Sequence, residues 1–85
     1  MEPQEDYSFT VLFEPAEEGG YVVTSPALPG LVTEGETLEE AREMAQDAIR
    51  GYLESLRKDG LPIPPDRPIA LDPIKETIKV ALQVV

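Results

Sequence analysis

Apolar and polar side chains alternate along the first part of the chain. In residues 7–14, YSFTVLFE, every second residue is apolar, and a second run, YVVTS (21–25), is rich in β-branched residues. Alternation of period two is typical of a strand with one buried face. PAEEGG (15–20) lies between the runs and contains paired glycines, so we expect a β-hairpin with a loop longer than the shortest type. The side chains expected to face the core from the first strand are Tyr7, Phe9, Val11 and Phe13.

The stretch SPALPGLVTEGETLEEA (25–41) joins this hairpin to a helix. Its Leu-Pro-Gly-Leu at 28–31 fits a type II turn, because proline pre-sets φ at the second position and glycine provides a positive φ at the third. LVTE (31–34) predicts a short third strand, and Gly35 lets the chain turn again. The stretch is therefore either a ligand-binding loop or a tight corner between two elements.

A helix is predicted over residues 38–59. Thr37 and Glu40 have the spacing of a capping box, and Gly60 followed by Pro62 is typical of a helix end. Acidic residues lie near the start of the helix and basic residues near its end, which complements the helix dipole. Apolar residues recur at spacings of three and four and predict one buried face; they are Leu38, Ala41, Ala45, Ala48, Ile49, Tyr52 and Leu56.

Residues 60–74, GLPIPPDRPIALDPI, contain five prolines. They form either a linker or an extended strap against the core, and the regularly placed apolar side chains favour the strap. Residues 77–85 alternate again and predict a last strand, which could lie parallel or antiparallel to the first. The sequence thus predicts a single domain over residues 1–85 with an α+β fold. Its order is β-β-β-α-β, with one long helix covering one face of a four-stranded sheet.

Charge is distributed unevenly. The net charge is −10, and residues 1–41 contain ten acids and no base, whereas residues 42–85 contain seven of each. Such a field repels nucleic acid and attracts a basic partner, although a charged surface also keeps a small protein in solution. Neither a basic face nor stacking aromatic residues are present, so we expect no direct nucleic-acid binding.

Catalysis is not expected from these residues. The chain has no cysteine and no histidine, which removes the commonest general base and the commonest transition-metal ligands. A β-meander, a helix and a parallel fourth strand also begin the ribonuclease H type of nuclease, but the strands here lack the clustered carboxylates that its metals need. No phosphate-binding glycine motif occurs. We therefore expect no catalytic residue, metal site or cofactor. The acidic start and the lack of a long apolar run predict a cytoplasmic protein without a membrane segment.

Residues 7–65 resemble the HicB family, the antitoxins of HicA–HicB toxin–antitoxin systems. The resemblance lies in the aromatic strand followed by Gly-Gly-Tyr-Val-Val, in Ser-Pro-Ala-Leu-Pro-Gly followed by Gly-Glu-Thr-Leu-Glu-Glu-Ala, and in a helix ending with Lys-Asp-Gly-Leu-Pro-Ile-Pro-Pro. It implies a degenerate ribonuclease H-like fold without the nuclease carboxylates. Family members bind a small, basic, RNA-cleaving toxin. Many also carry a C-terminal DNA-binding segment, and no such domain is expected in the twenty residues after Pro65.

Two functions follow as hypotheses. The first is an antitoxin that binds and neutralises a HicA-type toxin; the second is an orphan oligomeric binding module without a toxin. Either could form a homo-oligomer, a dimer or tetramer, through the sheet face or the apolar last strand. The acidic corner is the expected contact surface, formed by Pro26, Leu28, Pro29, Gly30, Glu34, Gly35 and Glu36.

Overall fold

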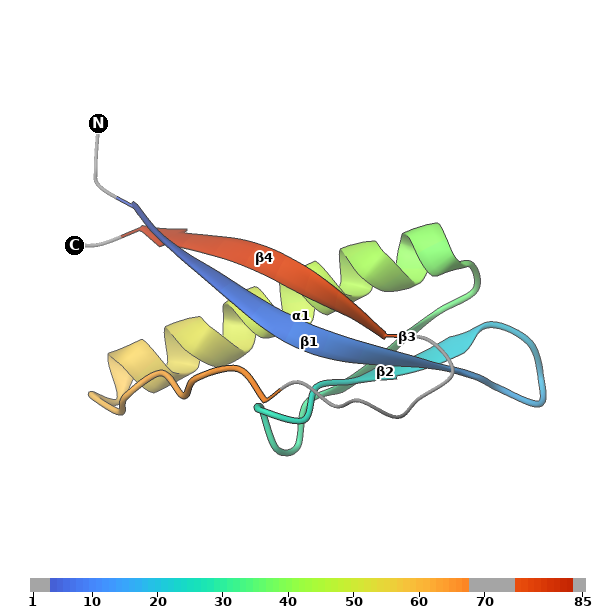
Figure 1. Ribbon diagram of the computed structural model, residues 1–85, viewed down its shortest axis with the longest axis horizontal. Helices are drawn as coiled ribbons and strands as arrows, with labels where there is room; N and C mark the ends of the chain where they lie inside the picture. Colours follow the sequence, from blue (N-terminus) through green and yellow to red (C-terminus); the bar gives the residue numbers. More distant parts are fainter. Residues whose placement is uncertain (1–3, 68–74, 84–85) are drawn as a thin grey trace.

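The first alternating run forms strand β1, which spans Gln4–Pro15 in the computed structural model. The structure describes residues 4–67 and 75–83. Strands β2 (Tyr21–Thr24) and β3 (Val32–Gly35) follow, then helix α1 (Leu38–Lys58) and strand β4 (Lys75–Gln83). This order and the single helix behind the sheet confirm the predicted α+β fold (Figure 1). β1 begins three residues earlier than predicted, because its residues 4–12 pair with β4 over the whole length of that strand.

The sheet has the order β3-β2-β1-β4, and every neighbouring pair is antiparallel. The direction of β4 was open in the sequence, and the structure decides it: Phe9 lies opposite Ile78 in an antiparallel register. In the ribonuclease H type the fourth strand is parallel to the first, whereas here β4 is antiparallel to β1. The described sheet therefore resembles that fold in the order of its elements but not in the direction of its last strand.

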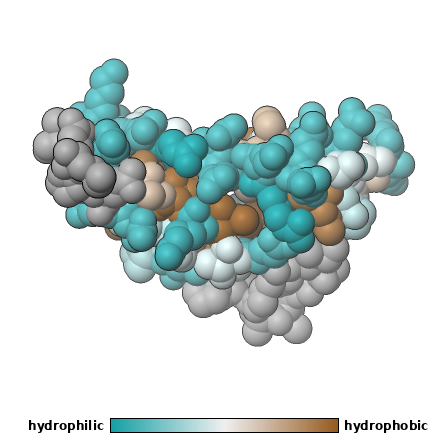
Figure 2. All heavy atoms as spheres, turned by 90° about the horizontal axis from the view of Figure 1, so that it is seen from above, coloured by the Kyte–Doolittle hydropathy of each residue, from teal (hydrophilic) through white to brown (hydrophobic). Residues whose placement is uncertain are grey.

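One face of the sheet and one face of α1 form the core. The buried helix residues Ala41, Ala45, Ile49 and Leu53 repeat at spacings of four, and two of them are alanines, which let the helix backbone approach the sheet closely. Figure 2 shows hydrophobic residues in a band along the middle of the visible face, bordered by hydrophilic side chains. The sheet and the connecting loops contribute Phe9, Val11, Phe13, Val23, Ala27, Leu28, Leu31, Val80 and Leu82 to this core.

The predicted start of α1 is confirmed, and the helix ends at Lys58, one residue before its predicted end, with Asp59 as the C-cap. The Thr37 hydroxyl accepts a hydrogen bond from the Glu40 amide at 3.0 Å, and the Glu40 carboxylate accepts one from the Glu36 amide at 2.6 Å. The second bond reaches one residue further back than in a standard capping box. At the other end, Gly60 has φ of +71°, and the Gly60 and Leu61 amides bond to helix carbonyls as in a Schellman motif.

The described part of the strap, residues 60–67, lies against the sheet. Ile63 packs on the core, and the Asp66 carboxylate accepts hydrogen bonds from the Thr10 amide at 2.7 Å and the Thr10 hydroxyl at 2.8 Å. β2 turns away from β1 just here, and the Ser25 hydroxyl donates to the Thr10 carbonyl at 2.8 Å. Two side chains thus satisfy the backbone groups of Thr10 that a longer β2 would have paired. The rest of the predicted strap, 68–74, lies outside the described residues.

Candidate functional site: an acidic hollow beside β3

The predicted contact residues divide into two groups in space. Pro26, Leu28, Pro29 and Gly30 form a double turn, in which the Leu28 amide bonds to the Ser25 carbonyl and the Leu31 amide to the Leu28 carbonyl, both at 3.1 Å. Gly30 has φ of +87°, as its type II turn requires. Leu28 is fully buried, whereas Pro29 and Gly30 are exposed.

This double turn is held against the C-terminal half of the helix. The Tyr52 hydroxyl donates a hydrogen bond to the Pro29 carbonyl at 2.9 Å. Leu28 supports the turn from inside the core, and only the Pro29–Gly30 tip faces solvent. The described structure therefore gives this part of the stretch the geometry of a tight corner.

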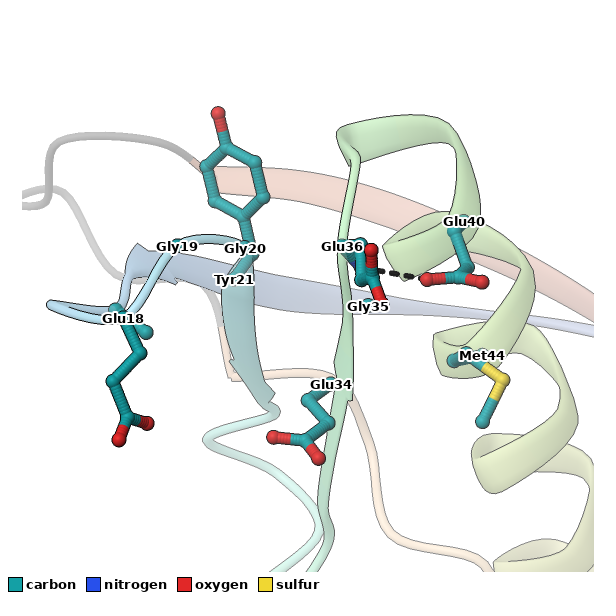
Figure 3. Close-up of a pocket in the computed structure, with 10 residues that line it drawn as sticks. Glu18, Gly19, Gly20, Tyr21, Glu34, Gly35, Glu36, Glu40 and Met44 are labelled. Atoms are coloured by element: carbon teal, nitrogen blue, oxygen red, sulfur yellow. Dashed lines mark hydrogen bonds between the residues drawn. The ribbon is translucent and has the colours of Figure 1, made fainter.

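The second group, Glu34, Gly35 and Glu36, borders a hollow of about 740 Å³. The hollow lies between the β1–β2 turn, the end of β3 and the first turns of α1 (Figure 3). Figure 3 shows Tyr21 on one side of β3, and Met44 and Glu40 of the helix on the other. Its full lining is Ala16, Glu18, Gly19, Gly20, Tyr21, Glu34, Gly35, Glu36, Glu40 and Met44.

Close backbone contacts shape the hollow at two glycines. A Cβ atom on Gly20, where φ is +78°, would lie 2.7 Å from the Gly35 carbonyl oxygen. A Cβ atom on Gly35 would lie 2.5 Å from the Ala41 nitrogen. Both distances are below those that real Cβ atoms show, so the hairpin turn, β3 and the helix come together only because neither residue has a side chain.

The lining is acidic and partly apolar. Its ionisable carboxylates are Glu18, Glu34, Glu36 and Glu40, which are all exposed, and the lining contains no lysine or arginine. Met44, 40% exposed, and the half-buried Tyr21 add apolar surface. Within residues 4–67 and 75–83, no three carboxylates come close enough to hold a metal ion. The chemistry offered is that of a site for an organic cation with an aliphatic stem, such as lysine or arginine.

Seven of the lining residues were not among the predicted contacts: Ala16, Glu18, Gly19, Gly20, Tyr21, Glu40 and Met44. The sequence placed them in a turn, a strand and a helix, and only the folded chain brings them together. The Gly-Gly-Tyr of the hairpin and the Gly-Glu-Thr before the helix were the available signals, since both mark places where backbones approach closely.

A second, smaller hollow lies at the other end of the molecule. Here the Tyr7 hydroxyl donates to the Glu5 carboxylate at 2.5 Å, and Arg57 contacts the same carboxylate at 3.1 Å. The hydrogen bond to Glu5 raises the pKa of Tyr7 above its ordinary value, although Arg57 opposes the shift. These groups bind one another on an exposed surface, and the raised pKa of Tyr7 favours its protonated hydroxyl over an activated phenolate.

The sequence of the chain is similar to that of a known family. The family model of HicB-like antitoxins of bacterial toxin–antitoxin systems matches residues 9–82. The chain is 41% identical over 76 residues to the protein named antitoxin HicB 1 of Photorhabdus laumondii, an alignment covering 89% of this chain and 49% of that protein. It is 38% identical over 61 residues to antitoxin HicB of Escherichia coli K12, covering 72% of this chain and 44% of that protein.

A relative of similar length is a UPF0150 protein of Thermoplasma acidophilum, 48% identical over 58 residues, which cover 68% of this chain and 84% of the relative. The chain thus spans about half the length of the proteins named as antitoxins. Among the residues that the structure describes, no helix is both long enough and apolar enough to cross a membrane. The match over residues 9–82 means that this chain belongs to the HicB-like antitoxin family of bacterial toxin–antitoxin systems.

Proposed function

We propose that this protein is an antitoxin that binds and neutralises a small, basic, RNA-cleaving toxin of the HicA type. Its membership of the HicB-like antitoxin family is the observation that carries the proposal. The action is binding rather than catalysis, in the cytoplasm, where such a toxin would meet RNA.

Electrostatics supports a basic partner. The chain has a net charge of −10, and its first 41 residues contain no base. The carboxylates of the hollow lie in this field, and the Glu40 carboxylate is held in place at the helix cap by the backbone amide of Glu36. Complementary charge speeds encounter and orients the two proteins, while it repels the RNA that the toxin cleaves.

Co-expression with the basic protein of the neighbouring reading frame tests the proposal. We expect that protein to arrest growth when expressed alone, growth to recover when this chain is co-expressed, and the two to co-purify. Binding should weaken steeply with added salt, because exposed charges more than about 10 Å apart are screened at 0.1 M salt. A neighbouring product that is neither toxic nor retained on the tagged chain would refute the antitoxin function.

A second candidate is an orphan homo-oligomeric binding module, a dimer or tetramer. It is favoured by the relative of similar length, which is named only as a UPF0150 protein. Sedimentation of the purified chain over a range of concentrations tests it. A strict monomer at micromolar concentration that also binds no toxin would exclude both candidates.

A further inference from the structure

The two edges of the sheet present different backbone groups. β4 is one edge and β3 is the other. Hydrogen-bonded and non-hydrogen-bonded residues alternate along an antiparallel pair, and the Ala16 amide bonds to the Gly20 carbonyl at 3.0 Å. The backbone hydrogen bonds between β1 and β2 are therefore made by even-numbered residues. Those between β2 and β3 are made by odd-numbered residues. By this alternation the amide and carbonyl groups of Val32 and Glu34 point away from the sheet.

Side chains of α1 occupy the β4 edge. The Lys79 carbonyl accepts a hydrogen bond from Gln46 at 3.4 Å, and the Gln83 carbonyl accepts one from Arg57. Arg42 adds a bidentate ion pair to Glu76 at 2.6–2.8 Å. These contacts cover the edge in one of the ways that proteins use to prevent edge pairing. In the described part of the chain no residue makes a corresponding contact with the outward backbone groups of β3.

Apolar and acidic groups lie along the β3 edge. The Val32 side chain is 65% exposed, the largest exposure among the large hydrophobic residues described. Glu34 lies two residues further along, and the hollow with Met44 and Glu40 opens beside it. An added strand would therefore find backbone partners, an apolar contact and carboxylates within one short stretch.

We propose that an extended, basic segment of a partner protein adds to β3 as a further strand, with a lysine or arginine side chain entering the acidic hollow. This rests on the proposed function and specifies how the toxin is held. Main-chain hydrogen bonds to Val32 and Glu34 give affinity, as in other strand-addition complexes. The cation pairs with Glu34 and Glu36 while its aliphatic stem contacts Val32, which lies on the same face of β3 as Glu34.

Charge selects this occupant over a second copy of the chain. A two-fold antiparallel pairing of β3 about Thr33 would set Glu34 opposite Val32 of the copy, so the carboxylate would have no cation to pair with. The two chains also repel each other, since each has a net charge of −10. A basic strand meets the same groups with attraction.

A pair of substitutions at one position separates the backbone contribution from the charge. Glu34→Gln removes the carboxylate and keeps the amide, whereas Glu34→Pro removes both. Proline is tolerated at an edge position whose amide faces outward, and neither change removes a β2–β3 hydrogen bond. Glu54→Gln is the matched control, because Glu54 is exposed on the helix and does not line the hollow.

The probe is the basic toxin co-purified with the full chain, its affinity measured by titration at two salt concentrations. We expect Glu34→Gln to weaken binding several-fold and to reduce its salt dependence. Glu34→Pro should weaken binding about tenfold further, since it removes a hydrogen bond, and Glu54→Gln should bind as the unmodified chain does. Circular dichroism and urea unfolding verify that each variant is folded.

Amide hydrogen exchange gives a second readout. The Val32 and Glu34 amides should exchange rapidly in the free protein and at least about tenfold more slowly in the complex, since a hydrogen-bonded amide exchanges only when it opens. If the toxin binds but Glu34→Pro matches Glu34→Gln and neither amide is protected, the docking proposal is wrong while the antitoxin function stands. If the unmodified chain does not bind the toxin, the proposed function fails first. A concentration-dependent oligomer that Glu34→Pro dissociates would assign the edge to a second copy and overturn the proposal.

Discussion

Two glycines should respond oppositely to the same added methyl group. Gly35 is buried, and a Cβ atom there would lie 2.5 Å from the nitrogen and 2.7 Å from the Cα of Ala41, and 2.9 Å from the Glu40 carbonyl carbon. All three are backbone atoms, so no side chain can rotate away and the helix start must move. Gly51 lies within α1 on its solvent-exposed side, and no atom lies within 4 Å of the added Cβ atom.

The magnitudes follow from these contacts. Overpacking against fixed backbone puts Gly35→Ala at the upper end of the usual range, a loss of about 3 kcal/mol in the free energy of unfolding. Gly51→Ala should raise that free energy by about 0.5–1 kcal/mol, because alanine has the higher helix propensity. A domain of this size has a total stability of roughly 4–13 kcal/mol, so the first change removes a large part of it.

Equilibrium urea unfolding of both variants beside the unmodified chain measures the difference, and thermal unfolding should agree. Gly35→Ala is expected to lower Tm by roughly 10–20 °C and Gly51→Ala to raise it by a few degrees. An unchanged slope of the urea transition verifies that the same surface unfolds. A loss below about 1 kcal/mol for Gly35→Ala would show that the helix start adjusts freely, contrary to the close packing inferred here.

Three further changes test contacts of the strap, the Pro29 turn and the core, away from the hollow. Asp66→Ala should lower the free energy of unfolding by about 2–3 kcal/mol, because the amide of Thr10, a residue only 4% exposed, loses its hydrogen-bond partner. In a double-mutant cycle with Thr10→Val, urea unfolding should show a coupling energy of about 1 kcal/mol between the two residues. Additive losses would contradict the contact. Tyr52→Phe should cost about 0.5 kcal/mol and speed hydrogen exchange around the Pro29 turn. Leu53 is fully buried, so Leu53→Ala should lower the free energy of unfolding by about 3 kcal/mol. A loss under about 1 kcal/mol would contradict the place of Leu53 in the core.

Features with local signals could be predicted from the sequence. The Leu-Pro-Gly-Leu turn, the Thr37 cap and the Gly60 end each depend on a few neighbouring residues, and the structure confirms all three. The direction of β4 could not be predicted, because a proline-rich connection of about fifteen residues is long enough for either placement. The bonds from Thr10 to Asp66 join residues 56 positions apart and gave no local signal.

The candidate site divides in the same way. Glu34 and Glu36 were expected at a contact surface from the acidic stretch before the helix, and the structure places them at the hollow. Tyr21 and Met44 reach it from a strand and a helix whose relative position depends on the packing of the whole core. The role of Gly35 as a spacer also became visible only in the fold, where it is wedged against Ala41.

Helix α1 gives the two edges of the sheet different electrostatic character, ion-paired at β4 and acidic at β3. Arg42 and Arg57 extend toward β4 and bind there, whereas Glu40 and Met44 border the hollow beside β3. Every lysine and arginine of the chain follows residue 41, so the hairpin and β3 contribute only acids. The negative charge is therefore distributed unevenly across the sheet and is concentrated at the β3 edge. A uniform charge would attract a basic partner equally to all surfaces, but this gradient draws it to the edge where the described backbone groups remain open.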